Sequence, residues 1–290
     1  MRVGVHCSIR KGFVGALEEA HALGCDTLQI FTQSPRGWQA RVYLDSEFEE
    51  FRIRRRELKL DPLVVHSPYL PNLCTSNPLL YKKSVGWLRE DLKRCEKLGA
   101  EYLVIHPGSF SPGSSPEDGL GNLIEAINRG LEAVSGKSVV LIENMAGGGR
   151  RVGSTFEELA AILGGIDQRN RIGICFDTCH ASGAGYDLSS TDAVKNTLDE
   201  FEKSVGLDNI RVFHVNDSKG EIGDHRDRHE HIGKGVVGLK GFKALFSWPQ
   251  FSDRILILET PKDPAPKSDL KNLKVLRSLL PEHSGKIHLK

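Results

Sequence analysis

Several features that mark other classes of protein are missing from this sequence of 290 residues. No uninterrupted apolar run is long enough to cross a bilayer, and the first residues, MRVGVHCSIRKG, contain no apolar signal core. The 6 cysteines include no CxxC pair, which excludes the usual zinc-finger spacing and favours free thiols in a reducing compartment. We therefore expect an intracellular, cytoplasmic protein with no membrane partner.

The charge is not biased to one sign. Lys and Arg together number 39, Asp and Glu number 38, and the formal net charge is +1. A polyanion such as DNA would have to meet a local basic patch, because the chain has no overall positive field. Hydrophobic residues make up 39% and charged residues 27%, a balance that favours a sizeable buried core over disorder.

Short apolar runs recur along the chain and alternate with helical patterns. We expect eight strands, at residues 3–6, 27–31, 63–66, 102–106, 138–144, 172–177, 210–216 and 255–259. The runs are unbroken, as in parallel strands buried on both faces. Eight strands, each followed by a helical segment, predict an α/β fold of the TIM (β/α)8 barrel type, a single domain over residues 1–290. A doubly wound sheet is the alternative, but residues 6–12 lack its Gly-rich turn.

Two helix starts are predicted from their capping residues. Ser154-Thr-Phe-Glu157 has the form of a capping box, in which the first side chain and the glutamate each bond to the backbone of the other. Ser268 is expected to cap the last helix, over residues 270–280. The segment that follows Asp177 and contains His180 is interpreted as a turn.

Histidine and acidic side chains mark the carboxyl ends of strands three to eight. In a TIM barrel these ends form one ring around the mouth where active sites lie. The loops that leave the same rim add more, and two of them, Asp227 and His229, would point to one side of an extended segment. The nine candidates are His66, His106, Glu143, Asp177, His180, His214, Asp227, His229 and Glu259. For His6, His21, His225 and His231 we expect a structural role and no metal ligation.

So many converging carboxylates and imidazoles predict bound cations. Buried without them, these groups would be costly. Mixed imidazole and carboxylate ligands without thiolate suit zinc, with manganese or iron as alternatives in part of the site. More than six ligands indicate a cluster with a shared carboxylate. A cluster in turn indicates phosphoester chemistry, in which two or more ions stabilise the attacking and the leaving oxygen.

Four long motifs resemble the endonuclease IV family, the zinc-dependent apurinic/apyrimidinic endonucleases of DNA base-excision repair. The motifs are LIENMAGGG at 141–149, FDTCHASGAGYD at 176–187, HVNDSK at 214–219 and DRHEHIGKG at 227–235. The resemblance covers nearly the whole chain and implies a TIM barrel with three zinc ions. It assigns the first ion to His66, His106 and Glu143, the second to Glu143, Asp177, His214 and Glu259, and the third to His180, Asp227 and His229.

The resemblance also implies a reaction and a substrate. A metal-bridging hydroxide, oriented by the bridging ligand Glu143, would hydrolyse the phosphodiester bond 5′ to an abasic site in double-stranded DNA. The products would be a 3′-hydroxyl and a 5′-deoxyribose phosphate, and removal of 3′-blocking groups is expected as well. Arg36, Tyr69 and Leu70 match positions that penetrate the duplex. The resemblance fits a monomer that works at the nucleoid.

One position departs from the family pattern. Gly148 stands where many relatives carry Gln, within the glycine loop 147–149. Because the ligand Glu143 is unaffected, we expect altered loop contacts with intact chemistry.

Other functions fit part of the pattern. A metal-dependent sugar isomerase or epimerase of the xylose-isomerase-like barrels would use only the second set of ligands and leave the other five candidates without a purpose. A non-catalytic binder of damaged DNA would be signalled by a lost ligand, and none is lost. For Tyr69 and Leu70 the alternative is that they merely cover the barrel rim.

Overall fold

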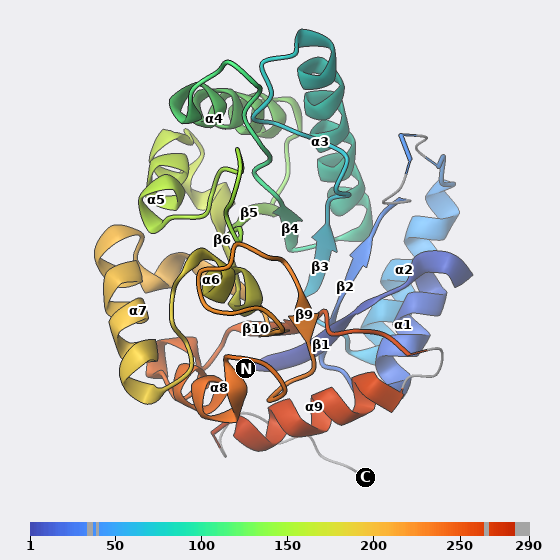
Figure 1. The fold of residues 1–290 in the computed structure, drawn as a ribbon. Helices are drawn as coiled ribbons and strands as arrows, with labels where there is room; N and C mark the ends of the chain where they lie inside the picture. Colours follow the sequence, from blue (N-terminus) through green and yellow to red (C-terminus); the bar gives the residue numbers. More distant parts are fainter. Residues whose placement is uncertain (34–36, 39–40, 264–266, 282–290) are drawn as a thin grey trace.

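A closed barrel of parallel strands forms the centre of the computed structural model, which describes residues 1–33, 37–38, 41–263 and 267–281 (Figure 1). Around the barrel the strands follow the order β1-β10-β7-β6-β5-β4-β3-β2. Their bounds are β1 (Arg2–Cys7), β2 (Thr27–Phe31), β3 (Leu63–His66), β4 (Tyr102–Ile105), β5 (Val139–Glu143), β6 (Ile172–Asp177), β7 (Ile210–His214) and β10 (Ile255–Leu258). The TIM barrel and all eight predicted strands are thereby confirmed. That one domain takes in all of residues 1–290 stays a prediction.

Helices cover the outside of the barrel (Figure 1). The long ones are α1 (Gly12–Ala22), α2 (Asp45–Leu58), α3 (Pro78–Leu98), α4 (Pro116–Ala133), α5 (Phe156–Gly165), α7 (Thr191–Ser204), α8 (Gly238–Phe246) and α9 (Lys267–Leu279). Short 3-10 turns are η1 (Ile9–Lys11), η2 (Arg169–Arg171), η3 (Leu207–Asn209) and η4 (Pro249–Phe251). In the part of the chain that the structure describes, no helix is long and apolar enough to cross a membrane.

A cluster of buried apolar side chains fills the barrel interior beneath its mouth. This cluster consists of Val64, Val104, Leu141, Cys175, Val212, Ile255 and Ile257, all buried. Side chains two residues apart on a strand point to the same face. The residue two places further along therefore also faces inward, and in six strands it is a predicted candidate: His66 after Val64 is one example. The strand geometry thus places a ring of polar side chains directly above an apolar floor.

Three local predictions are wrong. The capping box of α5 pairs Thr155 with Glu158, one residue later than the predicted pair, because the sequence contains two overlapping S/T-x-x-E patterns. Ser268 lies inside α9, which begins at Lys267, so it does not precede the helix as a cap. The segment with His180 is a helix, α6 (Thr178–Ala184), whose first turn is capped by the Asp177 carboxylate.

A candidate metal centre at the barrel mouth

Glu143, at the end of β5, is the carboxylate on which the imidazoles converge. Its Oε2 atom lies 3.1 Å from Nε2 of His66 and 3.1 Å from Nε2 of His106. Its Oε1 atom lies 3.1 Å from Nδ1 of His214 and 3.2 Å from Nδ1 of His180. The side chain is only 1% exposed. Each carboxylate oxygen therefore faces a different part of the cluster, as a bridging ligand requires.

Asp177 and Glu259 approach the same side of His214. Nδ1 of His214 lies 3.2 Å from Oε2 of Glu259 and 3.9 Å from Oδ2 of Asp177. The other oxygen of Asp177, Oδ1, accepts a 2.7 Å hydrogen bond from the backbone N–H of His180, at the start of α6. Oδ2 of Asp177 accepts from the side-chain amide of Asn216 at 2.7 Å. These bonds fix the plane of the Asp177 carboxylate.

His180, Asp227 and His229 meet at the rim, where the loop after β7 folds back over the barrel. Nε2 of His180 lies 3.3 Å from Oδ2 of Asp227, and Nε2 of His229 lies 3.1 Å from Oδ1. The loop is held by the antiparallel pair β8 (Asp217–Ser218) and β9 (His229–Glu230). Asp227 and His229 do point to one side, as the spacing predicted. The Asp227 side chain is 48% exposed, so this is the outer edge of the centre.

The three predicted sets therefore each come together in space. Within each, the candidate ligand atoms lie within 4.8 Å of one another. The sets are His66, His106 and Glu143; Glu143, Asp177, His214 and Glu259; and His180, Asp227 and His229. The sulfur of the buried Cys179 also lies within 4.8 Å of candidate ligand atoms of Asp177 and His229. The sequence pattern predicts no role for this cysteine.

The residues fit bound cations. Nε2 of His180 and Nε2 of His229 are buried, and among the described residues neither has a hydrogen-bond partner, although a carboxylate oxygen of Asp227 is close to each. Buried polar atoms of this kind are rarely left unsatisfied. Imidazole nitrogens and carboxylate oxygens around common points are the donor set that zinc takes in proteins. An ion between them would satisfy both nitrogens.

The electrostatics of these groups agree with that donor set. Burial alone would raise the pKa of the Glu143 carboxyl, but His214, His106 and His180 outweigh it and hold that pKa well below its usual range. Burial alone would lower the pKa of His229, but Asp227, Asp177 and Glu259 raise it to about 9. Without a cation the carboxylates therefore draw protons onto the imidazoles. Metal ions that bind such sites displace those protons.

The two remaining strands complete the ring with residues that sequence reasoning missed. His6 in β1 and Gln29 in β2 are paired in register and face the same interior. Nδ1 of His6 lies 3.0 Å from Oε1 of Glu259, and Nε2 of Gln29 donates to that oxygen at 2.6 Å. His6 is expected from the sequence to be structural, and Gln29 stands inside an apolar strand without ending it. Strand periodicity, counted from the predicted ends, was the signal that could have found them.

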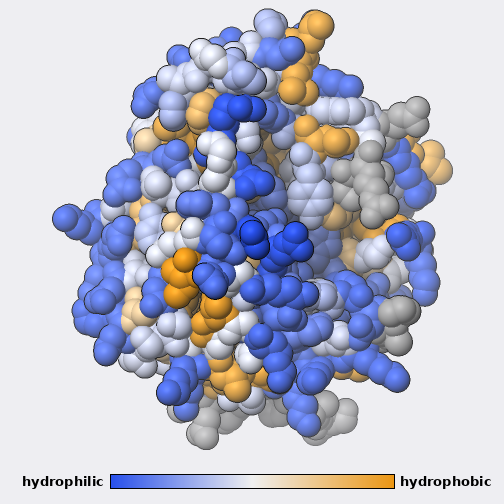
Figure 2. All heavy atoms as spheres, in the orientation of Figure 1, coloured by the Kyte–Doolittle hydropathy of each residue, from blue (hydrophilic) through white to orange (hydrophobic). Residues whose placement is uncertain are grey.

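A cavity of about 350 Å³ lies beside the centre, at the mouth. Tyr69, His106, Arg151 and Asp227 are among the residues that line it. The Tyr69 side chain is 62% exposed, with its ring centroid 5.5 Å from that of His106. Leu70 is partly buried. The face seen in Figure 1 is mainly hydrophilic around its middle (Figure 2). Arg36, the other predicted DNA contact, lies outside the described residues.

The glycine loop after β5 has the conformation that only glycine adopts readily. Gly147, Gly148 and Gly149 have φ angles of 78°, 82° and 63°. A Cβ atom on Gly148 would lie 3.0 Å from the Cβ of His225, and Nδ1 of His225 bonds to the carbonyl of Ala146 at 3.0 Å. The structural role expected for His225 stays a prediction. The imidazole thus occupies the space beside Gly148.

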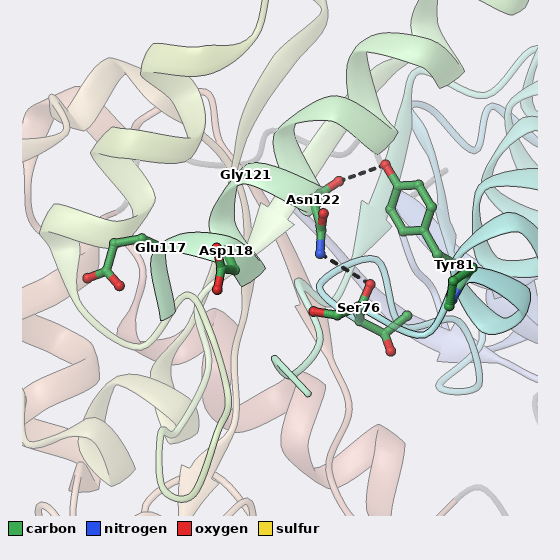
Figure 3. Close-up of a pocket in the computed structure, with 8 residues that line it drawn as sticks. Ser76, Tyr81, Glu117, Asp118, Gly121 and Asn122 are labelled. Atoms are coloured by element: carbon green, nitrogen blue, oxygen red, sulfur yellow. Dashed lines mark hydrogen bonds between the residues drawn. The ribbon is translucent and has the colours of Figure 1, made fainter. Parts of the chain in front are cut away.

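A second cavity, of about 570 Å³, lies between the first turns of α3 and α4 (Figure 3). Its polar groups are mostly satisfied within the protein: the Tyr81 hydroxyl donates to the Asn122 carbonyl, and the Asn122 amide donates to the Thr75 carbonyl. The candidate ligands are absent from its lining. The candidate metal ligands therefore lie at the barrel mouth and not in this second cavity.

Known proteins resemble this chain over nearly its whole length. The family model of xylose isomerase-like TIM barrels matches residues 17–279. A probable endonuclease 4 of Halothermothrix orenii is 42% identical over 277 residues, covering 96% of this chain and 99% of the relative. An endonuclease 4 of Thermus thermophilus is 42% identical over 283 residues, covering 97% and 99%.

Solved structures agree with these relatives. The crystal structure of endonuclease IV from Thermus thermophilus has a TM-score of 0.85 at 41% identity, covering 96% of this chain and 98% of that one. A D-tagatose 3-epimerase-like protein has a TM-score of 0.74 at 20% identity, covering 96% and 97%, which shows a common fold alone. The chain therefore belongs to the endonuclease 4 family, within the xylose isomerase-like TIM barrels.

Proposed function

We propose that this protein is a metal-dependent DNA repair endonuclease. It hydrolyses the phosphodiester bond 5′ to abasic sites in duplex DNA, leaves a 3′-hydroxyl and a 5′-deoxyribose phosphate, and also removes 3′-blocking groups. The observation that carries the proposal is the convergence of three ligand sets on one barrel mouth, with Glu143 common to two of them. Membership of the endonuclease 4 family supports it.

Three zinc ions would be held by the three ligand sets, with manganese or iron able to replace zinc in part. When bound, such ions supply a water of lowered pKa and positive charge beside the phosphate. The apolar floor of the barrel and the 2% or lower exposure of His66, Glu143, Asp177 and His214 keep bulk water from the inner ligands. Low local polarity strengthens every charge interaction there.

The protein's own groups would orient the reactants. Glu143 has both oxygens directed into the cluster, so its carboxylate can bridge two ions and hold the attacking water by a hydrogen bond. The cavity beside it is open to the surface next to Tyr69, and an extrahelical sugar phosphate could enter there. Tyr69 and Leu70 would fill the gap left in the duplex. Arg36 is proposed for the same task.

A sugar isomerase or epimerase is the second candidate, because Glu143, Asp177, His214 and Glu259 form a set of their own and epimerases share the fold. The five other candidate ligands, which include the buried His66 and His180, argue against an epimerase. An epimerase with one or two ions would leave these without cations. The nuclease accounts for all nine side chains.

A monomer is sufficient for the proposed reaction, because all nine ligands come from one chain. The proposed substrate would bring the enzyme to chromosomal DNA in the cytoplasm.

The deciding experiment is incision of a labelled duplex that carries one tetrahydrofuran abasic analogue, with EDTA present and no added magnesium. The analogue cannot undergo β-elimination, so a single cut on its 5′ side that leaves an extendable 3′-hydroxyl indicates hydrolysis by tightly held metal. The same duplex without the analogue is the control. No cut by enzyme with full zinc occupancy would exclude the nuclease, and sugar epimerisation would then be tested.

A further inference from the structure

We propose that Gln29 is a positioning residue of the metal centre: its amide orients the ring of His214 and the carboxylate of Glu259 toward the second ion. Gln29 is not a ligand in any of the three sets. The inference rests on the proposed function, because it assumes that the second set binds a metal ion. It concerns a residue of β2, a strand that supplies none of the nine predicted ligands.

The amide of Gln29 lies between two of the ligands. Nε2 of His214 donates to Oε1 of Gln29 at 2.8 Å. Nε2 of Gln29 donates to Oε1 of Glu259 at 2.6 Å. The Gln29 and His214 residues are 0% exposed, so these bonds have no competition from solvent. One side chain thereby holds one atom of each candidate ligand, and the other atom of each faces the cluster.

The bond to His214 decides which ring nitrogen can bind metal. A neutral imidazole carries one proton, and here Nε2 carries it because it donates to Gln29. Nδ1 is then the nitrogen left for a metal ion, and Nδ1 faces Oε1 of Glu143 at 3.1 Å and Oε2 of Glu259 at 3.2 Å. A lone pair directed at carboxylate oxygens is repulsive, so Nδ1 shares either a proton or a metal cation with them. Gln29 therefore selects the tautomer that binds metal.

The orientation of the amide is fixed by its three neighbours. Rotating it by half a turn would set its oxygen against Oε1 of Glu259 and its NH2 group against the N–H of His214, which are two repulsive contacts. In the observed orientation its nitrogen also lies 2.9 Å from Nδ1 of His6. The His6 ring packs on Phe31, with ring centroids 4.4 Å apart. Gln29 is thus also held in place by its neighbour on β1.

Thr27 provides a matched control on the same strand. It is also 0% exposed and points to the same side of β2 as Gln29, two residues away. Its hydroxyl donates to the carbonyl of Pro62, at the opposite end of the barrel from the ligands. A Thr27→Val change disturbs a buried polar group of this strand without touching the metal centre.

The test measures zinc release, not activity. Purified zinc-loaded wild type, Gln29→Met, Gln29→Glu and Thr27→Val are mixed with excess chelating dye, and the release of each ion is timed by absorbance. Methionine matches the volume of glutamine but cannot bond to either ligand. We expect one ion to leave Gln29→Met about 10- to 100-fold faster than wild type, with the other ions unchanged. Thr27→Val should match wild type.

The Gln29→Glu variant keeps the inference testable if the methionine variant does not fold. Its new carboxylate could still accept from His214 but would repel Glu259, so faster release of the same ion is again expected. Wild type that binds three ions, with both Gln29 variants releasing them at the wild-type rate, would overturn the inference and leave the proposed function standing. Equally fast release from Thr27→Val would overturn it too. Wild type that binds no zinc would overturn both proposals.

Discussion

The imidazoles of the centre are oriented before any ion binds. Nδ1 of His66 donates to the carbonyl of Ser67 at 2.6 Å, and Nδ1 of His229 donates to the carbonyl of Glu259 at 3.0 Å. In both rings the opposite nitrogen, Nε2, faces the carboxylates and is the atom left for a metal ion. Such outer bonds fix the tautomer and strengthen the ligand. The centre is therefore preorganised at the level of single residues.

Glu143→Gln should abolish cleavage and spare binding to abasic DNA. The amide keeps the size of the side chain but loses the charge shared by His66, His106 and His214, and its NH2 group cannot ligate. We expect the rate constant for cleavage to fall more than about 100-fold, while the Kd for a tetrahydrofuran duplex changes little. Single-turnover incision and fluorescence anisotropy measure the two quantities. Unchanged turnover would remove Glu143 from its bridging role.

Tyr69→Ala combined with Leu70→Ala should weaken selection of damaged DNA. The exposed Tyr69 ring borders the mouth cavity, so its loss removes surface that would fill the gap beside an extruded sugar. We expect the ratio of Kd values for intact and abasic duplexes to fall roughly 10-fold or more, since base–aromatic stacking contributes about 1–3 kcal/mol per base. Zinc content should not change. A ratio equal to that of wild type would mean that both residues only cover the rim.

The start of α5 shows the limit of predicting a helix cap from a local sequence pattern. Two overlapping S/T-x-x-E patterns precede α5, and only the second is used, because Glu158 accepts hydrogen bonds from the backbone N–H groups of Gly153, Ser154 and Thr155. Nothing in the local sequence separates the two patterns. The backbone conformation of the loop between β5 and α5 determines which of the two patterns forms the cap.

Thr155→Ala should cost about 1 kcal/mol in the free energy of unfolding, the usual value for a lost N-cap. Its hydroxyl accepts from the backbone N–H of Glu158 at 3.2 Å. Ser154→Ala is the matched control, and it should cost markedly less because the Ser154 hydroxyl makes only a 3.4 Å contact with the Glu158 carboxylate. Urea unfolding at neutral pH measures both. Equal costs would contradict the assignment of the cap.

Helix α3 contributes a buried carboxylate that joins two rim loops. Asp91 is 0% exposed and accepts hydrogen bonds from Thr32 and Gln33, after β2, and from Ser67, after β3. Asp91→Ala would leave three donors without their acceptor, so we expect a loss of roughly 2–4 kcal/mol in the free energy of unfolding. Asp91→Asn keeps an acceptor and should lose less. If the alanine variant unfolds at the wild-type urea concentration, the network does not stabilise the fold.

The pH dependence of stability offers a second test of Asp91. Burial raises its pKa from 3.8 to about 6, because the charged form is poorly solvated. A carboxyl with a raised pKa contributes stability that is fully present below the unfolded value and is lost as the pH rises through the folded value. From about pH 4 to pH 7, wild type should therefore lose roughly 2–3 kcal/mol relative to Asp91→Asn. A constant difference between the two proteins across this range would contradict the raised pKa.

At the scale of the whole molecule, the eight strands and the convergence of the candidate ligands could be predicted from the sequence, but closure of the ring could not. The strand-end pattern located six candidate ligands because an apolar run that stops at His, Asp or Glu is visible locally. Gln29 has no such mark, since it interrupts TLQIF without ending it. Its role appears only when β1 and β2 close the barrel beside β10 and β3.

Removal of metal should lower the stability of the entire barrel in addition to abolishing activity. One inward side chain from or just after each of the eight strands lies in the ring, so carboxylates and imidazoles would be left buried there without the cations that neutralise them. Each ion present at 1,000 times its Kd contributes about 4 kcal/mol of stability, and about 1 kcal/mol shifts the Tm of a protein of this size by roughly 2–4 °C. We expect chelation to lower the Tm by more than about 10 °C, with recovery on adding zinc but not magnesium, which prefers oxygen ligands. Calorimetry of chelated, zinc-restored and magnesium-treated protein makes the comparison. A Tm indifferent to chelation, with zinc loss verified by elemental analysis, would show that the ring is stable without cations.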